Sequence, residues 1–317
     1  MARYIVHRLL AAVPVLLLTS IIVFLLMRML PGDPVLMIIS QAQTDVSAEL
    51  AERMRQEYGL TQPLYAQYSA WLWKLLSGDL GRSIISRQPA LDIVLTRMLP
   101  TAQISVTAWL LAMLISVPIG IVTAASQGSW KDWLGTILSL VGAAMPYFLT
   151  GGVLIYFVAM RWHWLPASGY VSPFVDPVRS IATTILPALT LTLWLASTIT
   201  RQTRASFIDV LQQAYIRTAR AKGLSQTRVI LWHALKNAML PVVTVLGIQL
   251  GSLFSGAVIT ETIFAVPGVG RLMVDGILSR DYPMVQAVVL FLTLVVVLAN
   301  LLVDVAYGIL DPRSRRG

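Results

Sequence analysis

The chain contains no cysteine and only three histidines. The lack of cysteine excludes disulfide bonds, thiolate metal ligands and cysteine nucleophiles. The histidines, His7, His163 and His233, lie far apart and form no H-E-x-x-H pair, so neither a zinc site nor a haem site is expected. The sequence therefore predicts no catalytic residue and no metal site.

Charged residues are scarce as well. They make up 12% of the 317 residues, about half of the roughly 25% that is typical of soluble domains. Hydrophobic residues make up 56%, and the mean hydropathy is +0.73. A chain so poor in charge cannot cover a globule of this length with polar surface, which excludes a water-soluble enzyme. Disorder is excluded too, because disordered chains lack the apolar residues that abound here. The composition predicts a protein that folds in lipid.

Six stretches are long and apolar enough to cross a bilayer, which takes about 20 residues per helix. They are residues 9–30, 101–125, 134–160, 181–200, 239–260 and 284–308. The first is too long for the apolar core of a signal peptide and is interpreted as a retained anchor. The sequence predicts an all-α membrane protein with six transmembrane helices.

The basic residues indicate the orientation of these helices. If the amino terminus is cytoplasmic, the inner segments carry the whole net charge of +9. Because basic residues accumulate in cytoplasmic loops, this distribution predicts that both termini are inside. The sequence pI of about 10.1 then reflects membrane topology, and no nucleic-acid partner is expected.

The same pattern predicts four parts of the chain. They are a cytoplasmic amino terminus with the first transmembrane helix (1–30), an extracytoplasmic helical subdomain (31–96), a core of five helices (97–308) and a basic cytoplasmic tail (309–317). In the subdomain, Ser47 is a predicted N-cap for a helix that ends near Tyr58, and Pro63 opens another helix. The second helix has Tyr68 and Trp71 at helical spacing. This stripe fits packing against the bilayer or its own core, and a docking surface for an extracytoplasmic partner is the alternative.

The inner segment 201–240 combines seven basic residues with one acidic residue and has helical periodicity. Residues 215–222 predict a short basic helix that ends at Gly223, and Ser225 is a predicted N-cap for the next helix. That helix is predicted to line one stripe with Val229, Ile230, Trp232 and Leu235. Two interpretations stay open: a basic amphipathic segment on anionic lipid headgroups, or a helix presented to a cytoplasmic partner.

Motifs for energy coupling are absent from the sequence. None of the four lysines follows a glycine, as the P-loop requires, so no ATP site of that kind is predicted. No acidic or basic residue lies in the central turns of a predicted span, which argues against a proton or sodium relay. The chain is predicted to form a transport path and to depend on other proteins for the energy of transport. The polar residues Gln103, Thr107, Gln249 and Asn300 are candidates to line the path, and interhelical hydrogen bonding is their alternative role.

The basic inner segment resembles the cytoplasmic coupling loop of binding-protein-dependent ABC importers. The resemblance rests on the runs Tyr215-Ile216-Arg217-Thr218-Ala219-Arg220-Ala221-Lys222-Gly223-Leu224 and His233-Ala234-Leu235-Lys236-Asn237-Ala238-Met239-Leu240-Pro241. Further runs occur in the order typical of the dipeptide/oligopeptide/nickel permease family, and in particular of its dipeptide permease B-type subunits. They are Pro31-Gly32-Asp33-Pro34, Gly78-Asp79-Leu80-Gly81-Arg82-Ser83, Glu261-Thr262-Ile263-Phe264, Pro267-Gly268-Val269-Gly270, Arg280-Asp281-Tyr282-Pro283 and Asn300-Leu301-Leu302-Val303-Asp304 with Asp311-Pro312-Arg313.

The chain departs from the general permease motif at two points. Arg217-Thr218-Ala219 stands where other branches have Glu-Ala-Ala, and the gap from Gly223 to Leu240-Pro241 is longer. Both departures match the peptide branch of the family.

The resemblance implies a type I ABC importer permease fold in the bacterial cytoplasmic (inner) membrane. It implies a second homologous permease subunit, two cytoplasmic ATPase subunits that bind ATP-Mg, and an extracytoplasmic solute-binding protein. The chain itself is then a transport subunit without enzymatic activity or a cofactor of its own. The implied contacts to the ATPase are Tyr215, Arg217, Thr218, Ala219, Arg220, Ala221, Lys222 and Gly223.

The substrate stays open at this point, since members of this family carry dipeptides, longer peptides, glutathione or nickel complexes. Two alternatives from other functional classes are a membrane receptor or scaffold subunit that only binds, and an ion-coupled secondary transporter.

Overall fold

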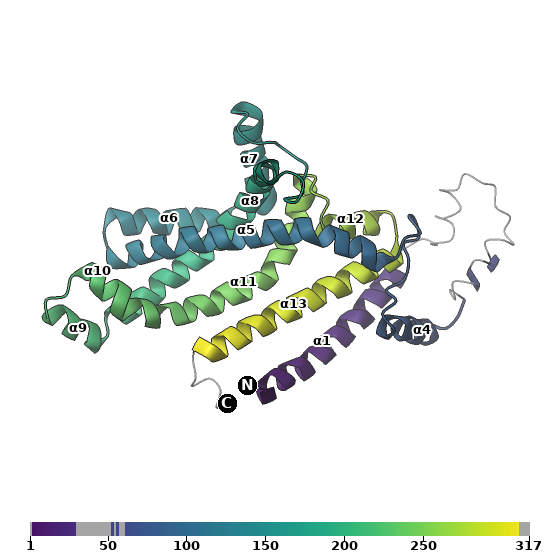
Figure 1. The fold of residues 1–317 in the computed structure, drawn as a ribbon, viewed down its shortest axis with the longest axis horizontal. Coiled ribbons are helices and arrows are strands. Elements are labelled where there is room, and N and C mark those ends of the chain that lie inside the picture. The colour runs from purple at the N-terminus through teal and green to yellow at the C-terminus, as the bar shows by residue number, and fades with distance from the viewer. Residues whose placement is uncertain (1, 30–51, 54, 57–60, 311–317) are drawn as a thin grey trace. The chain divides into compact units, whose positions relative to one another are not determined.

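The computed structural model describes residues 2–29, 52, 53, 55, 56 and 61–310 (Figure 1). Over these residues the chain is mostly helical, and its β-structure is a single bridge between Arg82 and Pro89. The helix predicted between Ser47 and Tyr58 lies largely outside the described residues.

Within the described residues, five helices are long and apolar enough to span a membrane. They are α1 (Ala2–Met29), α5 (Ala90–Ala125), α8 (Pro177–Leu211), α11 (Leu235–Ile263) and α13 (Tyr282–Leu310). Four of them contain a stretch predicted from the sequence, and α1 contains residues 9–29 of the first stretch. Helices α8 and α11 extend beyond the predicted stretches at both ends, and Pro187 and Pro241 lie inside them.

The third predicted stretch, 134–160, is not one straight helix. It divides into α6 (Trp130–Ala144) and α7 (Tyr147–Leu154), and α7 continues as the π-helix η1 (Ile155–Arg161). The two halves meet at an angle of 106° and count either as one broken span or as a re-entrant pair. The break follows from Pro146, which lacks a backbone N–H and disfavours helical geometry at Met145. Met145 is accordingly extended, with φ −81° and ψ 120°.

The chain forms two compact units, and each is discontinuous in sequence. Unit 1 comprises Met1–Arg8, Pro100–Pro267 and Val296–Gly317, and unit 2 comprises Leu9–Leu99 and Gly268–Val295. In unit 1, α8 packs against α6 and α11. The buried side chains of α8, among them Leu186, Leu191, Leu195 and Ile199, form the centre of its apolar core.

Unit 2 joins two runs of sequence that lie about 200 residues apart. The carboxylate of buried Asp281 accepts hydrogen bonds from the Ser83 hydroxyl and from the backbone N–H of Ile84 at 3.1 Å. Gly81 has φ +86°, and a Cβ at this position would lie 3.3 Å from Cβ of Pro283. The tight turn at Gly81 therefore brings the first run onto the start of α13.

Helix α4 (Leu64–Leu76) also belongs to unit 2 and carries the predicted aromatic stripe. Its Tyr68 and Trp71 rings lie 5.4 and 5.9 Å from the ring of Phe24 in α1. The Tyr68 hydroxyl also shares a hydrogen bond of 2.8 Å with the Ser20 hydroxyl. The stripe thus packs on α1.

Candidate functional site

The predicted short basic helix is present as α9 (Ala214–Ala221) in unit 1. Lys222 is its C-cap, and Gly223 follows with φ +79°, in the left-handed region that favours glycine. The backbone N–H of Gly223 donates to the Arg220 carbonyl at 2.9 Å, and the N–H of Leu224 donates to the Ala219 carbonyl at 3.4 Å. The stop predicted at Gly223 is therefore a left-handed helix cap.

Helix α9 has one buried face and one exposed face. Ile216 and Ala219 are buried in a cluster with Phe207, Val229, Ile230, Ala234 and Ala238. The exposed residues are Tyr215, Arg217, Thr218, Arg220, Ala221, Lys222 and Gly223. Seven of the eight residues proposed for partner contact thus lie at the surface, whereas Ala219 supports the helix from inside.

The support behind α9 consists of α10 (Gln226–Arg228) and the π-helix η2 (Val229–Ala234), which runs directly into α11. The predicted stripe does not form one face at Trp232, because Val229 and Ile230 are buried whereas Trp232 is 79% exposed. A π-helix has a wider turn than an α-helix, with i→i+5 bonding. The buried positions therefore continue at Ala234 and Ala238, and Trp232 faces outward.

Two hydrogen bonds connect this region to the long helices of unit 1. The Asn237 side-chain amide donates to the Tyr215 hydroxyl at 2.9 Å, which links α9 to the first turns of α11. The Gln226 side-chain amide donates to the Ala125 carbonyl at 3.4 Å, at the end of α5. A displacement of α9 would therefore act on α11, and a displacement of α10 would act on α5.

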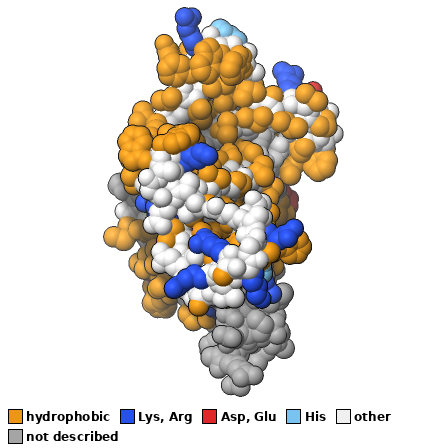
Figure 2. Space-filling view, turned by 90° about the vertical axis from the view of Figure 1, so that its left-hand side faces the viewer, with side chains coloured by type: hydrophobic (Ala, Val, Ile, Leu, Met, Phe, Trp, Pro, Cys, Tyr) orange, Lys and Arg blue, Asp and Glu red, His pale blue; other side chains and the backbone are white. Residues whose placement is uncertain are grey.

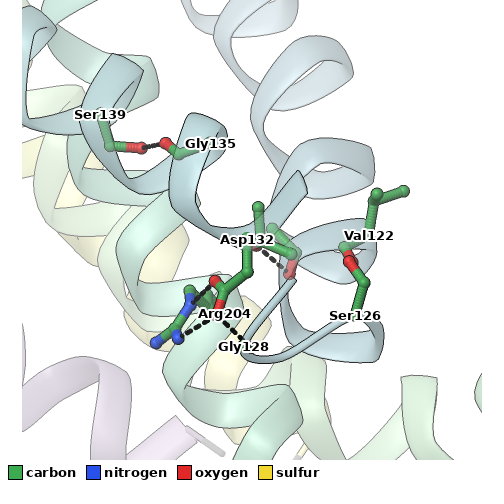
Figure 3. Close-up of polar contacts among 9 residues, drawn as sticks. Val122, Ser126, Gly128, Asp132, Gly135, Ser139 and Arg204 are labelled. Carbon is green, nitrogen blue, oxygen red and sulfur yellow. Dashed lines mark hydrogen bonds and ion pairs between the residues drawn. The ribbon is translucent and has the colours of Figure 1, made fainter. Parts of the chain in front are cut away.

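An ion pair ties α6 to α8 near the same end of unit 1 (Figure 3). Arg204 donates from Nε to Oδ1 of Asp132 at 2.6 Å and from Nη2 to Oδ2 at 2.9 Å. The backbone N–H of Gly128 donates to the same Oδ2 at 3.0 Å. Parallel bidentate contacts of this kind are the strongest form of the arginine–carboxylate pair. The sequence contained the acid and the base but no signal that pairs them across 72 residues.

Replacement of Asp132 by alanine should destabilise the protein, because Arg204 and the Gly128 N–H lose their acceptor. Breaking a fully buried pair costs about 3–5 kcal/mol, and about 2–3 kcal/mol is expected here because Arg204 is partly exposed. The measurement is thermal unfolding of the purified protein, with a double-mutant cycle on Asp132 and Arg204. Asp209→Ala is the control, since Asp209 is an exposed acid of α8. Additive effects in the cycle would show that the pair contributes nothing.

Gln103, the first candidate for the path, is held in a hydrogen-bond network. Its Nε2 donates to the hydroxyls of Ser180 at 2.8 Å and Thr184 at 2.9 Å, and its Oε1 accepts from the Tyr170 hydroxyl at 2.9 Å. Burial raises the pKa of Tyr170, so the phenol stays protonated and keeps its donor. Gln103 therefore links α5 to α8 and to the segment before α8, which contains Tyr170.

The other path candidates lie on different helices. Thr107 is half-buried in α5, and Asn300 is exposed on α13. Gln249 of α11 is only 6% exposed, and its Nε2 has no hydrogen-bond partner within the described residues. Its Oε1 accepts from the Ser252 hydroxyl at 3.1 Å. Across the described part of the chain, no hydrogen bond joins any of the four candidates to another.

Glu261 is a further buried polar group, which the sequence indicated only as an acid near the end of a span. Its side chain is completely buried at the end of α11. The carboxylate accepts a hydrogen bond of 2.5 Å from the Thr101 hydroxyl of α5. Ionisable groups are rare in this setting and need partners, so Glu261 is part of the internal structure of unit 1.

Comparison with solved structures shows a similar fold in an ABC transporter. A chain of the MetNI methionine ABC transporter, in an inward-facing conformation, superposes with a TM-score of 0.58 at 14% sequence identity. The match covers 70% of this chain and 97% of that chain. It supports the predicted type I importer fold.

Sequence comparison is more specific. The glutathione transport system permease proteins GsiC of Escherichia coli (strain K12) and Salmonella typhimurium (strain LT2) are both 41% identical to this chain over 315 residues. Each alignment covers 99% of both chains. Residues 1–105 match the amino-terminal part of the membrane component of binding-protein-dependent transport systems. Residues 116–316 match the family described as the inner membrane component of such systems. The chain therefore belongs to this family of ABC importer permeases and is a multi-pass inner-membrane transport subunit, not an enzyme.

Proposed function

We propose that this subunit imports glutathione or a peptide of similar size and forms half of the translocation path. The observation that carries the proposal is its 41% identity, over 99% of both chains, to glutathione transport system permease proteins. Selectivity in such a system is shared with the solute-binding protein. The proposed substrates are therefore small peptides as a class, and glutathione is the first candidate.

The partners follow from the same proposal. A second homologous permease completes the path, an extracytoplasmic binding protein delivers the solute, and two ATPase subunits hydrolyse ATP. This subunit binds one ATPase through α9, whose exposed face carries Arg217, Arg220 and Lys222, and the second permease binds the other ATPase. The C-terminal glycine cap, the buried Ile216 and the bond from Tyr215 to Asn237 make α9 a rigid element that is able to pass motion to α11.

The orientation belongs to the proposal too. With both termini inside, α9 faces the cytoplasm and residues 31–96 form the extracytoplasmic subdomain on the opposite side. In this arrangement the chain enters the extracytoplasmic side after residue 30, begins the membrane core after residue 96 and enters the cytoplasm after residue 308. The basic residues of the inner segment 201–240 support this arrangement.

The test is reconstitution in proteoliposomes with radiolabelled glutathione. Uptake should require the second permease, the ATPase subunits, the binding protein and ATP, and unlabelled dipeptides should compete. Uptake by this chain alone under an ion gradient would identify a secondary transporter instead. Binding without uptake by the full assembly would identify a receptor or scaffold. Full activity with another solute and none with glutathione would overturn the substrate assignment alone.

The path residues give a second expected result. Single cysteines at Thr107, Gln249 and Asn300, in this cysteine-free chain, should react with polar thiol reagents at rates that change when the assembly binds nucleotide. A residue that lines a gated aqueous path is reached by polar reagents in one state and shielded in another, whereas a lipid-facing residue is shielded in both. The measurement is mass-spectrometric labelling with and without ATP. Identical labelling in both states would show that these residues do not line a gated path.

A further inference from the structure

The π-helical turn η2 presents a pair of large apolar side chains to the surface of unit 1. Leu231 is 52% exposed and Trp232 is 79% exposed, although their neighbours Val229 and Ile230 are buried. This exposure follows from the geometry of the turn, since Ala234 closes the buried stripe and leaves the pair on the opposite side. Adjacent exposed apolar side chains mark a candidate contact site for lipid or another protein.

The position of this pair along the chain identifies the environment that it meets. The helix that contains this candidate span runs from Gln226 through α11 to Phe254, and its apolar stretch begins near residue 239. Leu231 and Trp232 thus lie about two turns before this apolar stretch, a distance of about 11 Å at 1.5 Å per residue. Tryptophan is enriched at this depth, where an amphipathic ring contacts both headgroups and acyl chains.

The charges around the pair select the kind of lipid. Arg228, His233 and Lys236 are exposed on the same short stretch, and the sequence from 210 to 260 contains no acidic residue. Figure 2 faces the side of the molecule on which α9 and α10 lie, and it shows Lys and Arg side chains gathered there among hydrophobic and uncharged ones. Each base near an anionic membrane surface adds to the attraction.

We propose that the η2 turn is a binding site for anionic phospholipid. Leu231 and Trp232 insert between the acyl chains at the interface, and Arg228 and Lys236 contact the phosphate of the headgroup. The bound lipid then stabilises the layer on which Ile216 and Ala219 pack, so the position of α9 depends on the membrane composition. The site goes beyond the import function and does not require a particular solute.

A lipid explains the pair better than the ATPase does. The residues proposed for the ATPase lie on the exposed face of α9, whereas Leu231 and Trp232 belong to the turn that leads into the bilayer. An apolar pair one or two turns from a spanning helix is expected to lie at the depth of the headgroups. Contact with the ATPase or with the second permease is the competing outcome of the test.

The experiment uses single-cysteine versions of this cysteine-free chain, reconstituted as full-length protein in bilayers of phosphatidylcholine and phosphatidylglycerol in equal parts. An environment-sensitive fluorophore is attached at Leu231→Cys or, separately, at Trp232→Cys, so that one site checks the other. Spin-labelled phosphatidylglycerol and spin-labelled phosphatidylcholine serve as quenchers. The control is Thr218→Cys, on the exposed face of α9.

Both η2 sites should be quenched, more strongly by the phosphatidylglycerol probe, and the Thr218 site should be quenched weakly. Arg228→Gln and Lys236→Gln should each lower the preference for phosphatidylglycerol about fivefold, whereas Arg217→Gln on α9 should leave it unchanged. Absence of quenching at both η2 sites would overturn the proposal. Equal quenching by the two lipids would show that the site does not recognise the anionic headgroup. Loss of quenching when the ATPase or the second permease is added would assign the surface to that protein.

Discussion

Replacement of Gly223 by valine should leave the protein in the membrane and ATP hydrolysis active, while solute uptake falls. Gly223 has φ +79°, and no neighbouring atom lies within 4 Å of a Cβ built there. The expected effect is therefore backbone strain and not a steric clash. A left-handed conformation costs a non-glycine residue about 1–2 kcal/mol, which corresponds to about 5- to 30-fold in the population of the correctly capped α9. The measurement is the ratio of solute imported to ATP hydrolysed in proteoliposomes.

The control for this prediction is Gly169→Val. Gly169 has φ +97° and equally open surroundings, but it lies in the segment between η1 and α8, far from α9 in sequence. It should show a similar loss of stability without a change in the coupling ratio. An unchanged ratio in Gly223→Val, or an equal drop in both variants, would show that the glycine cap has no specific role in coupling.

Replacement of Gly142 by leucine should produce the largest loss of stability. Gly142 is the point at which α6 approaches α8, and an added Cβ would lie 2.9 Å from the backbone carbonyl oxygen of Leu193. A side chain can rotate away from such a contact, but a helix carbonyl cannot, so the two helices must separate. Overpacking of this kind typically costs 1–3 kcal/mol, and about 3 kcal/mol or more is expected against a rigid backbone atom. Thermal unfolding in detergent and the yield of inserted protein measure the effect.

The matched control is Gly152→Leu. Gly152 is also a helical glycine, in α7, but nothing lies within 4 Å of a Cβ at this position. This variant should unfold at nearly the same temperature as the parent protein. Equal stability of the two variants would show that α6 and α8 do not need their close contact. Small residues let helices in lipid approach each other, where apolar side chains gain little from association.

Several features of the fold could be predicted from local sequence. Long apolar runs predicted the spanning helices, and Gly223 predicted the end of α9, because an apolar span and a left-handed cap are local properties. The third predicted stretch is divided into two helices that meet at an angle of 106°. Pro146 lies within an apolar stretch, and hydropathy alone does not register a missing backbone donor.

The candidate site was predicted only in part. The exposed bases of α9 followed from helical periodicity, whereas the outward position of Trp232 did not, because periodicity assumes the turn of an α-helix and η2 is a π-helix. The pairing of Asp132 with Arg204 joins helices that are 72 residues apart, and that of Ser83 with Asp281 spans 198 residues. No local pattern encodes which acid meets which donor.

The amino-acid sequence by itself determined that the chain folds in lipid, that it is helical and approximately where its helices end. Each of these properties follows from the polarity of neighbouring residues. Its ordered runs also indicated the family, which the comparisons confirmed. Only the tertiary structure decided which faces of α9 and η2 are buried, which glycines mark close helix contacts, and which polar groups are paired. Those properties depend on distances between residues remote in sequence, and these distances exist only once the helices have packed.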